Sequence, residues 1–457
     1  MVRNHLSRRK FIIRTAGSAM GCMALRPTKA ASSGVLGAND RLSVGILGAG
    51  DWSETLIAWV EKLYKSDNVL ITAVCDIWNQ RREIAGSRIA QNTPNPPRLC
   101  RTMAEICDLA DVDVLVIATP DFQHPFLTRQ AVEAGKDVYV EKPFGCDFEQ
   151  IKLARRAVKH TKRIVQAGTQ QRSKGVVWAA RDFVASGKLG KISYVEMSQP
   201  QFQQRWRIPD AEKSLSESDT NWAEFLYYTP PVPFNPRYYR EFRLFWPYST
   251  GIFCQWMSHM IDLVNMVLGE RPKAATAGGG IYVWQDGRNT PDTAQCLVEY
   301  PSGCLASYHM RMGNGANAHP LLIHGTCGTL DLFSGVVYGD GAGGEVVLRN
   351  PGSANPQFVV DAARRLPERA RGGLVLTAPP DGDHMSDFFA AVRSRKQPRA
   401  GIDSAFDHAL ATTMAGMSYR MGVRVQYDPV TDTVSPTESA GPTKPPEPQT
   451  TRTAPAS

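Results

Sequence analysis

Apolar and polar positions alternate regularly over residues 42–168. Short apolar runs of strand length are separated by segments with helical spacing, such as residues 126–136. The predicted strands are LSVGILG (42–48), VLITAVC (69–75), VLVIATP (114–120), DVYVEKP (137–143) and RIVQAG (163–168). Strands that alternate with helices predict a parallel sheet covered on both faces.

The pattern changes after about residue 170. A helix at 175–190 and a strand at 191–199 precede a long segment rich in Trp, Tyr and Pro, which runs to about residue 250. A helix at 253–269 follows. Strands joined by tight turns are then predicted at 274–284, 293–300, 304–312, 321–325 and 328–333, with late helices near 384–395 and 404–421. Neighbouring strands that are joined by tight turns pair antiparallel. We expect the Pro/Thr/Ser-rich tail, residues 430–457, to be disordered.

The composition is that of a globular protein with room for two domains. Of the 457 residues, 42% are apolar and 21% are charged. The net charge is +8, but seven of the 52 basic residues lie within residues 1–30, which contain no Asp or Glu. The rest of the chain is therefore close to neutral, which argues against a nucleic-acid partner.

The basic leader resembles a signal of the twin-arginine export route. Residues 7–12, SRRKFI, precede a short, mildly apolar run. We expect a signal and linker at residues 1–38, with cleavage near Ala30 or Ala38, and a protein that is exported to the periplasm or another extracytoplasmic space. No later stretch approaches the roughly 18–20 apolar residues of an integral membrane span. The nine cysteines include no CxxC pair, so they predict no metal site.

The first strand runs directly into a glycine-rich turn, GAGDWS (48–53). Gly48 permits the tight turn, and Gly50 lets the backbone approach a pyrophosphate at the N-terminus of the next helix, where Asp51 and Trp52 follow. Asp76 ends the second strand, at the place of a ribose-hydroxyl acceptor. The pattern predicts NAD as cofactor. Two arginines, Arg81 and Arg82, leave NADP possible.

Two further motifs lie where strands end. ATPDFQHP (118–125) supplies Thr119, Pro120 and His124 as cofactor-binding candidates. EKPFG (141–145) supplies Glu141 and Lys142. Ligands of an open parallel sheet bind beyond the carboxyl ends of its strands, so Lys142 is expected beside the nicotinamide. A desolvated lysine takes a lowered pKa suited to proton transfer, and Glu141 can orient its ammonium.

These motifs resemble those of the glucose-fructose oxidoreductase / inositol dehydrogenase / rhizopine-catabolism (Gfo/Idh/MocA) family over about residues 41–428. The resemblance rests on VGILGAG, ATPDFQHP, AVEAGKDVYVEKPFG, VQAGTQQRS, SHMIDLVNMVLG, PDTAQCLVEYPSG and FFAAVRSRKQP. It implies an α/β fold with a Rossmann NAD(P)-binding domain (39–168) and a C-terminal α/β domain (169–429). The second domain would have an open, mostly antiparallel sheet that forms homo-oligomer contacts. The active site would lie between the domains, with Lys142 catalytic.

The predicted helix at 253–269 supplies the other catalytic candidates. Gln255, His259 and Asp262 share one helical face. In many relatives an aspartate precedes the histidine by four residues, and the pair relays the proton of the substrate hydroxyl. Gln255 occupies that position here and cannot act as a base. We expect His259 to be the general base, with Asp262 taking part of the missing role.

The Trp- and Tyr-rich segment between residues 200 and 250 fits either a carbohydrate cleft or an oligomer interface. Its substrate-binding candidates are Tyr239, Arg243 and Trp246. The leading hypothesis is an oxidoreductase that transfers hydride between a CH–OH carbon of a sugar or sugar derivative and a tightly bound nicotinamide cofactor. Alternatives are a redox-neutral glycosidase or lyase that uses NAD transiently, and a non-catalytic sugar-binding relative.

Overall fold

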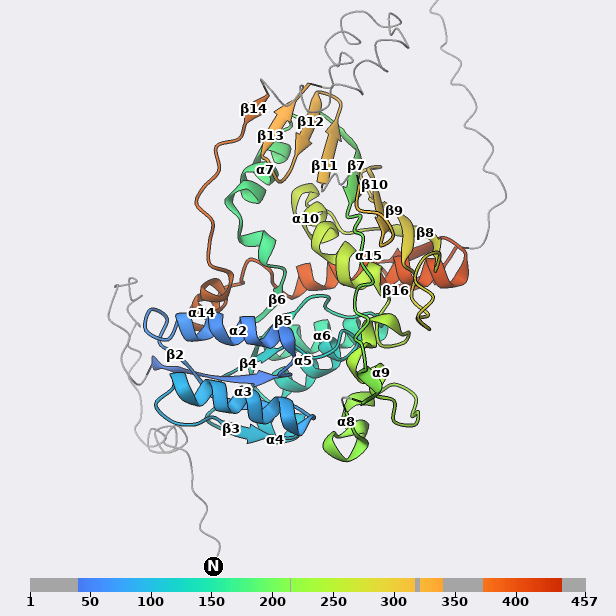
Figure 1. The fold of residues 1–457 in the computed structure, drawn as a ribbon. Helices are drawn as coiled ribbons and strands as arrows, with labels where there is room; N and C mark the ends of the chain where they lie inside the picture. Colours follow the sequence, from blue (N-terminus) through green and yellow to red (C-terminus); the bar gives the residue numbers. More distant parts are fainter. Residues whose placement is uncertain (1–39, 214, 317–320, 340–372, 438–457) are drawn as a thin grey trace, which may run out of the picture.

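The computed structural model describes residues 40–213, 215–316, 321–339 and 373–437, which form two sheets with their helices (Figure 1). The expected export signal and most of the expected C-terminal tail lie outside these residues. Within the described ranges, no helix is both long enough and apolar enough to cross a membrane.

The first sheet has six parallel strands in the order β3-β2-β1-β4-β5-β6, so the predicted Rossmann-type sheet is confirmed. Its strands are β1 (Leu42–Leu47), β2 (Val69–Cys75), β3 (Arg98–Cys100), β4 (Val114–Ile117), β5 (Asp137–Glu141) and β6 (Val165–Gly168). The short strand β3 was not predicted, because two of its three residues are exposed and give no apolar run.

Helices cover both faces of this sheet. They are α2 (Asp51–Lys62), α3 (Asn79–Asn92), α4 (Met103–Cys107), α5 (Gln123–Glu133) and α6 (Phe148–Thr161). Side chains of α2 and α3 pack with those of β1 and β2 in one cluster, whereas α4, α5 and α6 pack in another. The strand order reverses between β1 and β4, where open α/β sheets bind their ligands.

One helix from the end of the chain completes the first domain. Met385, Phe388, Phe389 and Val392 of α14 (His384–Ser394) pack in the same cluster as α2 and β1. Figure 1 shows α14 next to α2. The expected boundary between residues 168 and 169 therefore assigned this helix to the wrong domain.

The second sheet has ten strands in the order β14-β13-β12-β11-β7-β10-β9-β8-β15-β16, and only the pair β7–β10 is parallel. Its strands are β7 (Ile192–Ser198), β8 (Ala274–Gly280), β9 (Thr293–Glu299), β10 (Leu305–Arg311), β11 (Leu321–Gly325), β12 (Gly328–Asp331), β13 (Val336–Tyr338), β14 (Leu374–Val375), β15 (Val425–Asp428) and β16 (Thr433–Pro436). The predicted, mostly antiparallel sheet is confirmed. The expected disordered tail is corrected at its start, since β16 pairs with β15.

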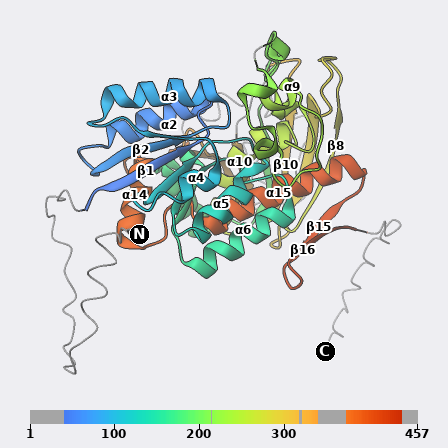
Figure 2. The same cartoon turned by 90° about the horizontal axis from the view of Figure 1, so that it is seen from below.

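Three longer helices pack against the buried side of the second sheet: α7 (Gly175–Ala185), α10 (Ser258–Leu268) and α15 (Ile402–Met421). Burial alternates residue by residue along β10, which indicates one covered and one open face. The view in Figure 2 places α15 between α6 of the first domain and β8 of the second. The long helix thus ties the two halves together.

Candidate active site

The glycine-rich turn forms the predicted cradle between β1 and α2. Gly48 has φ +91°, and an added Cβ would lie 2.8 Å from the carbonyl carbon of Ala118 on the neighbouring strand. An added Cβ at Gly50, by contrast, would meet no protein atom within 4 Å. The Ser53 hydroxyl donates to the Gly50 carbonyl at 2.6 Å and closes the first turn. The turn thus leaves open space at a helix N-terminus, as a pyrophosphate requires.

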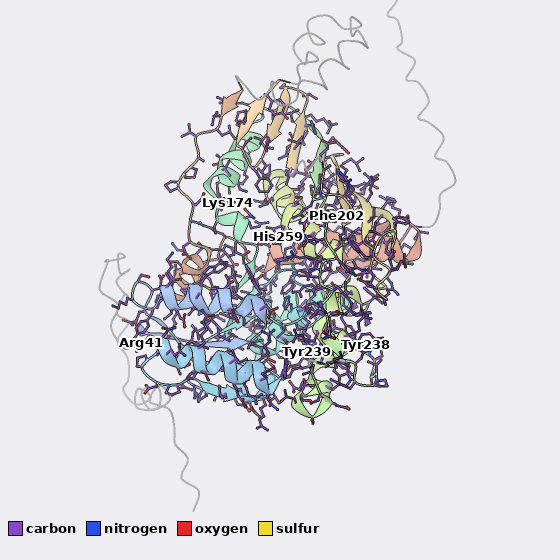
Figure 3. The ribbon with its side chains drawn as sticks, in the orientation of Figure 1. Arg41, Lys174, Phe202, Tyr238, Tyr239 and His259 are labelled. Carbon is purple, nitrogen blue, oxygen red and sulfur yellow. The ribbon has the colours of Figure 1, made fainter. Side chains whose placement is uncertain are left out.

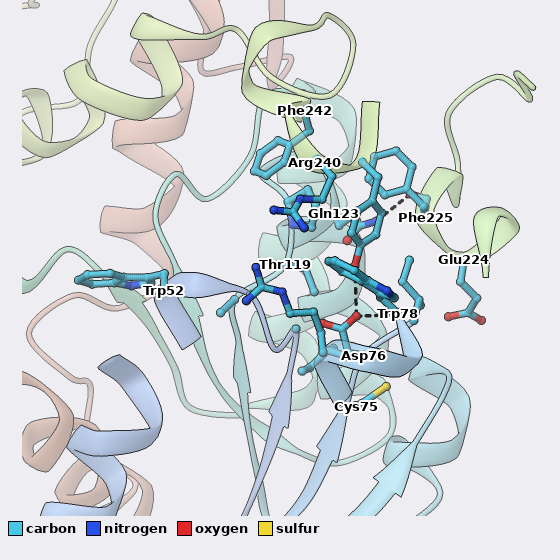
Figure 4. A pocket seen from close by; sticks show the side chains of 18 of the residues that line it. Trp52, Cys75, Asp76, Trp78, Thr119, Gln123, Glu224, Phe225, Arg240 and Phe242 are labelled. Carbon is cyan, nitrogen blue, oxygen red and sulfur yellow. Dashed lines mark hydrogen bonds between the residues drawn. The ribbon is translucent and has the colours of Figure 1, made fainter. Parts of the chain in front are cut away.

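Asp76 lies at the end of β2, as predicted, and lines the same cavity (Figure 4). Its carboxylate accepts hydrogen bonds from the backbone N–H groups of Ala49 (2.7 Å) and Trp78 (2.8 Å). The Tyr239 hydroxyl donates to it as well, at 3.2 Å. Burial raises the pKa of Asp76, and these hydrogen bonds oppose the rise. The carboxylate is fixed where a ribose hydroxyl can reach it.

Of the two predicted arginines, only Arg81 lines this cavity. Arg82 is buried and donates to the Asp76 carbonyl oxygen at 2.8 Å, so it is part of the scaffold. Arg81 pairs with Asp51 at 2.5 Å. Arg240 lies over the Trp78 ring at 5.0 Å and enters the cavity from the opposite side (Figure 4). We therefore place the adenosine end of the nucleotide around Asp76 and Trp78.

A second cavity continues from the first and contains the predicted catalytic pair. The two cavities share Asp51, Trp52, Ala118, Thr119 and Arg243. Lys142 and His259 both line the second cavity, and Figure 3 places His259 between the two sheets. A dinucleotide that extends from Asp76 through the shared residues would bring its nicotinamide to Lys142. Thr119 and Pro120 line this route as predicted.

Lys142 and His259 have complementary protonation states. The ammonium of Lys142 donates to the Gln255 carbonyl oxygen at 3.0 Å. Burial lowers the pKa of Lys142 to about 8, although the charges of Glu141 and Asp121 oppose this. Burial, and then the charge of Lys142, lower the pKa of His259 well below its ordinary value. Near pH 7 the cavity therefore presents a charged hydrogen-bond donor and a neutral base.

Glu141 orients Lys142 through its backbone and not through the ammonium. Its carboxylate accepts from the Lys142 N–H at 3.1 Å and from the Gln170 side chain at 2.8 Å. Burial raises the pKa of Glu141. A Cβ at Gly168 would lie 2.5 Å from this carboxylate, so the glycine on β6 leaves the space that Glu141 fills.

His124 joins the two loops at the ends of β4 and β5. Its Nδ1 lies 2.6 Å from the Pro143 carbonyl oxygen and its Nε2 lies 2.8 Å from that of Thr119. Burial lowers the pKa of His124. The ring lines the second cavity, but both nitrogens face the scaffold, so its contribution to cofactor binding is to hold these loops.

The prediction for the helical face at 253–269 was only partly right. The helix begins with the π-helical turn η6 (Phe253–Met257) before α10. Gln255 lies in the cavity, where its side-chain amide donates to Asp121 at 2.5 Å. Asp262 points elsewhere and pairs with Arg172 at 2.7 Å. Burial opposes ionisation of Asp262, but Arg172 and His408 outweigh it and lower its pKa to about 2. Asp262 therefore anchors α10 and does not share the role of the base.

Asp121 is the main site residue that the sequence analysis missed. It follows Pro120 beyond the end of β4, is buried, and accepts from both Gln255 and the Ser249 hydroxyl, the latter at 2.7 Å. Its position at a strand end was the available signal. Other cavity residues that were missed are Gln170, Gln171 and Trp256, whereas Arg205 and Trp206 belong to the aromatic segment in which a carbohydrate cleft or an interface was expected.

The substrate-binding candidates have three different positions. Arg243 lines both cavities. Tyr239 lies at the adenosine end, on Asp76 (Figure 3 marks its place). Trp246 lines neither of the two cavities. The Arg420 guanidinium lies 4.2 Å from the Trp246 ring centroid, and the Trp246 backbone N–H donates to the Asn289 side-chain oxygen at 2.6 Å. Of these three residues, only Arg243 reaches the second cavity.

The aromatic segment between the domains covers the first cavity. The short elements within this segment are η3 (Ala211–Lys213), η4 (Glu217–Asp219), α8 (Trp222–Leu226), α9 (Pro236–Arg240) and η5 (Phe242–Leu244). Another short element, η2 (Gln170–Ser173), precedes the segment. We call residues 219–243 the cover segment. Its aromatic rings form one cluster with Phe122 of the first domain. Within the longer aromatic segment, Arg205, Trp206 and Arg243 line the second cavity, so the expected carbohydrate cleft stays a prediction for that part of the segment.

Hydrogen bonds also hold the cover segment on the first domain. The Trp78 indole donates to Asp219 at 2.6 Å, and the Gln123 amide donates to the Phe225 carbonyl oxygen at 2.7 Å. On the other side, the Tyr228 hydroxyl donates to the Phe122 carbonyl oxygen at 2.8 Å. The segment therefore encloses the adenosine end of the cofactor cavity (Figure 4).

Comparison with known proteins assigns both halves of the chain. Residues 42–169 match the model of the oxidoreductase family with the NAD-binding Rossmann fold, and residues 177–331 match the GFO/IDH/MocA C-terminal domain. Inositol 2-dehydrogenase of Rhizobium meliloti (strain 1021) is 27% identical over 183 residues, which are 40% of this chain and 44% of that protein. The match thus spans less than half of this relative.

Two further similarities are longer. The 2,7-anhydro-N-acetylneuraminate hydratase of Escherichia coli (strain K12) is 23% identical over 296 residues, 64% of this chain and 67% of that protein. The solved structure of the WlbA dehydrogenase from Bordetella pertussis, in complex with NADH and UDP-GlcNAcA, superposes with a TM-score of 0.60 at 16% identity. It covers 85% of this chain and 99% of that one. This likeness supports the fold.

Proposed function

Because the chain belongs to the Gfo/Idh/MocA family of oxidoreductases, we propose that it transfers hydride between a CH–OH carbon of a sugar or sugar derivative and a nicotinamide cofactor. The observation that carries this proposal is that a protonated Lys142 and a neutral His259 line the same cavity. This cavity continues into the glycine-rich cradle. The dehydrogenase relatives support a polyhydroxylated substrate.

The chain's own residues have clear roles in such a reaction. The cofactor, when bound, accepts or returns the hydride. The Lys142 ammonium donates a hydrogen bond to the substrate oxygen, and His259 accepts the hydroxyl proton at a ring nitrogen. The backbone at Gly50 binds the pyrophosphate and Asp76 binds the ribose. We assign NAD in preference to NADP because the Asp76 carboxylate would repel a 2′-phosphate.

We further propose that the cofactor stays bound between turnovers. The cover segment supports this, since it lies over the first cavity and is held on the first domain by contacts such as Trp78–Asp219 and Gln123–Phe225, which should slow release of the nucleotide. Purified protein should then carry nicotinamide cofactor near one per chain and turn over repeatedly without added nucleotide. An empty protein that works only with millimolar added NAD would contradict retention.

A retained cofactor also favours a second candidate function, a redox-neutral elimination, addition or hydrolysis with transient oxidation of the sugar. The hydratase relative, similar over two thirds of its length, is the observation for this alternative. To separate the two, purified protein is incubated with polyols, aldoses, uronic acids and glycosides while absorbance at 340 nm and product formation are followed. A dehydrogenase produces NADH in step with product, whereas the redox-neutral reaction releases product with no net NADH. A compound that binds in calorimetry but is not turned over would instead support a protein that binds sugars without catalysis.

The open face of the second sheet is proposed as the surface of a homo-oligomer. Leu297 on β9 is 43% exposed on this face, and the residues around it are mostly polar. Sedimentation of Leu297→Asp and wild-type protein tests the assignment. A monomeric variant beside an oligomeric wild type is the expected result.

A further inference from the structure

We propose that Asp121 supplies the carboxylate that Lys142 requires beside it, and that Gln255 connects the two residues. The proposal rests on the proposed function in so far as Lys142 acts during turnover. Asp121 is, in this role, a positioning residue: it acts through Lys142 and Gln255, not on the substrate. Neither the family assignment nor the motif around Lys142 gives Asp121 a role.

The connection passes through both ends of Gln255. Its backbone carbonyl oxygen accepts from the Lys142 ammonium at 3.0 Å, and its side-chain amide donates to the Asp121 carboxylate at 2.5 Å. In a regular α-helix the carbonyl of Gln255 would be directed to the N–H of His259, four residues on. Here Gln255 lies in the π-helical turn η6, and such turns occur frequently at functional sites.

Asp121 is held so that its charge stays in place. The second carboxylate oxygen accepts from the Ser249 hydroxyl at 2.7 Å, and the Ser249 hydroxyl in turn accepts from the Gly251 N–H at 3.1 Å. Asp121 and Ser249 are both buried. Donors on both oxygens are the arrangement that an ionised carboxylate needs away from water.

The charges around Lys142 make this carboxylate necessary. Burial, Arg243 and Arg205 all favour loss of the Lys142 proton, whereas Glu141 and Asp121 favour its retention. His259 is neutral and adds no charge. The oxygens of Glu141 already accept from Gln170 and from the Lys142 backbone, on the β5 side. Asp121 therefore provides the negative charge on the side of the helix that carries His259. A glutamine at position 255 cannot provide it.

The test is a reciprocal exchange of carboxylate and amide. Asp121→Asn removes the carboxylate, and Gln255→Asp adds a second carboxylate beside Asp121. The double variant Asp121→Asn/Gln255→Asp exchanges the carboxylate and the amide between the two positions. The readout is the apparent pKa of Lys142, obtained from the pH dependence of trace acetylation of the whole protein followed by mass spectrometry. This readout needs no substrate, so it can fail independently of the proposed function.

Asp121→Asn should lower the apparent pKa of Lys142 by roughly one unit, as the loss of a neighbouring charge does. Gln255→Asp should not lower it, since one of the two adjacent carboxylates is expected to bind a proton, and the double variant should return it close to the wild-type value. Where turnover is measurable, the alkaline limb of kcat/KM should move in the same directions. The double variant should be at least about tenfold more active than Asp121→Asn, since a positioned proton donor contributes about a hundredfold.

The matched control is Asp113→Asn, the same substitution at the opposite end of β4, where Asp113 binds the Ser43 N–H at 3.0 Å. It should leave the titration of Lys142 unchanged. An unchanged titration in Asp121→Asn, or a double variant no closer to wild type than Asp121→Asn, overturns the proposal. If Asp121→Asn does not fold, the double variant decides alone, because a Lys142 pKa that lies about one unit below the wild-type value there contradicts a charge effect through this contact.

Discussion

Asp121 and Asp262 are both buried aspartates on the elements that form the active site, yet their partners give them different roles. Asp262 faces Arg172 and His408, away from the cavity, and its charge is neutralised within the scaffold. Asp121 faces Gln255 and lies in the cavity with Lys142. The two carboxylates thus differ in their partners: Asp262 pairs with a buried arginine, whereas Asp121 accepts hydrogen bonds from neutral groups.

The Lys142 pKa predicts the pH dependence of the reaction. With a pKa of about 8, Lys142 loses its proton above that pH, so kcat/KM should decline there. His259 remains neutral far below pH 6.5, so we expect no acid limb from His259 near neutrality. Lys142→Met should reduce turnover on the order of a hundredfold and abolish the alkaline limb.

Lys152→Met is the control for this lysine substitution, because Lys152 pairs with Glu149 on α6 and lines neither of the two cavities. It should leave the pH profile of kcat/KM unaltered. An alkaline limb that persists in Lys142→Met would assign this titration to another group.

Gly50 provides a second prediction for a single residue. A Cβ at Gly50 meets no protein atom within 4 Å, and a valine side chain there would occupy the space in which we expect the pyrophosphate. Gly50→Val should therefore abolish nucleotide binding in calorimetry and keep a native circular dichroism spectrum. Gly278→Val, also in open space but on the exposed strand β8, should bind normally. Tight binding to Gly50→Val would exclude this pyrophosphate site.

Residues at strand ends were predictable from the sequence, whereas residues defined by distant contacts were not. Gly48, Gly50, Asp76 and Lys142 follow from a parallel sheet, because its topology brings the carboxyl ends of its strands to one edge. Asp262 was misassigned because helical spacing gives a face but not its neighbour, and Arg172 is 90 residues away. The π-helical turn has no signal in the hydrophobic pattern.

At the scale of elements, α10 is the support of the catalytic histidine. Asp262 joins it to Arg172 in η2 and, at 3.6 Å, to His408 in α15. Helix α10 thus contacts both η2 and α15. Asp262, which does not act as a base, thus fixes helix α10, which carries the proposed base His259.

Asp262→Asn should lower the free energy of unfolding by about 3 kcal/mol, because Arg172 is left buried without a counter-charge. The pKa of Asp262 is lowered on folding to about 2, so its contribution is complete above about pH 4 and is lost as the pH falls toward 2. Urea denaturation at several pH values checks both points.

A surface pair provides the comparison for this measurement. Asp182→Asn removes an exposed partner of Arg181 and should change stability by less than about 0.5 kcal/mol. If Asp262→Asn costs no more than Asp182→Asn, the ion pair with Arg172 does not anchor α10.

The cover segment is the second element with a measurable role. The contact between Asp219 and the Trp78 indole is a charge-assisted hydrogen bond, worth about 1.5–3 kcal/mol. Asp219→Ala should therefore accelerate dissociation of bound NADH by roughly tenfold or more in stopped-flow fluorescence. Glu217→Ala, an exposed substitution in the same short helix η4, should not. Equal rates in the two variants would show that opening of this segment does not limit release.

At the scale of the molecule, the leader and the retained cofactor belong to one proposal. The twin-arginine route carries folded proteins, so a nucleotide can be loaded in the cytoplasm and enclosed before export. Replacing Arg8 and Arg9 by Lys should leave the precursor in the cytoplasm, as fractionation and immunoblotting would show. Unchanged localisation of this variant in the cell envelope would exclude the twin-arginine route.

The packing of α14 has a consequence for the order in which the chain is made. The apolar surface of α2 and β1 is covered by Phe388 and Phe389, which leave the ribosome only after nearly the whole second domain. The nucleotide-binding half is therefore synthesised early but remains incomplete, with apolar surface open to water, until the last part of translation. A truncated chain that ends after β6 should aggregate, and a chaperone that shields nascent chains would bind this half for most of its synthesis.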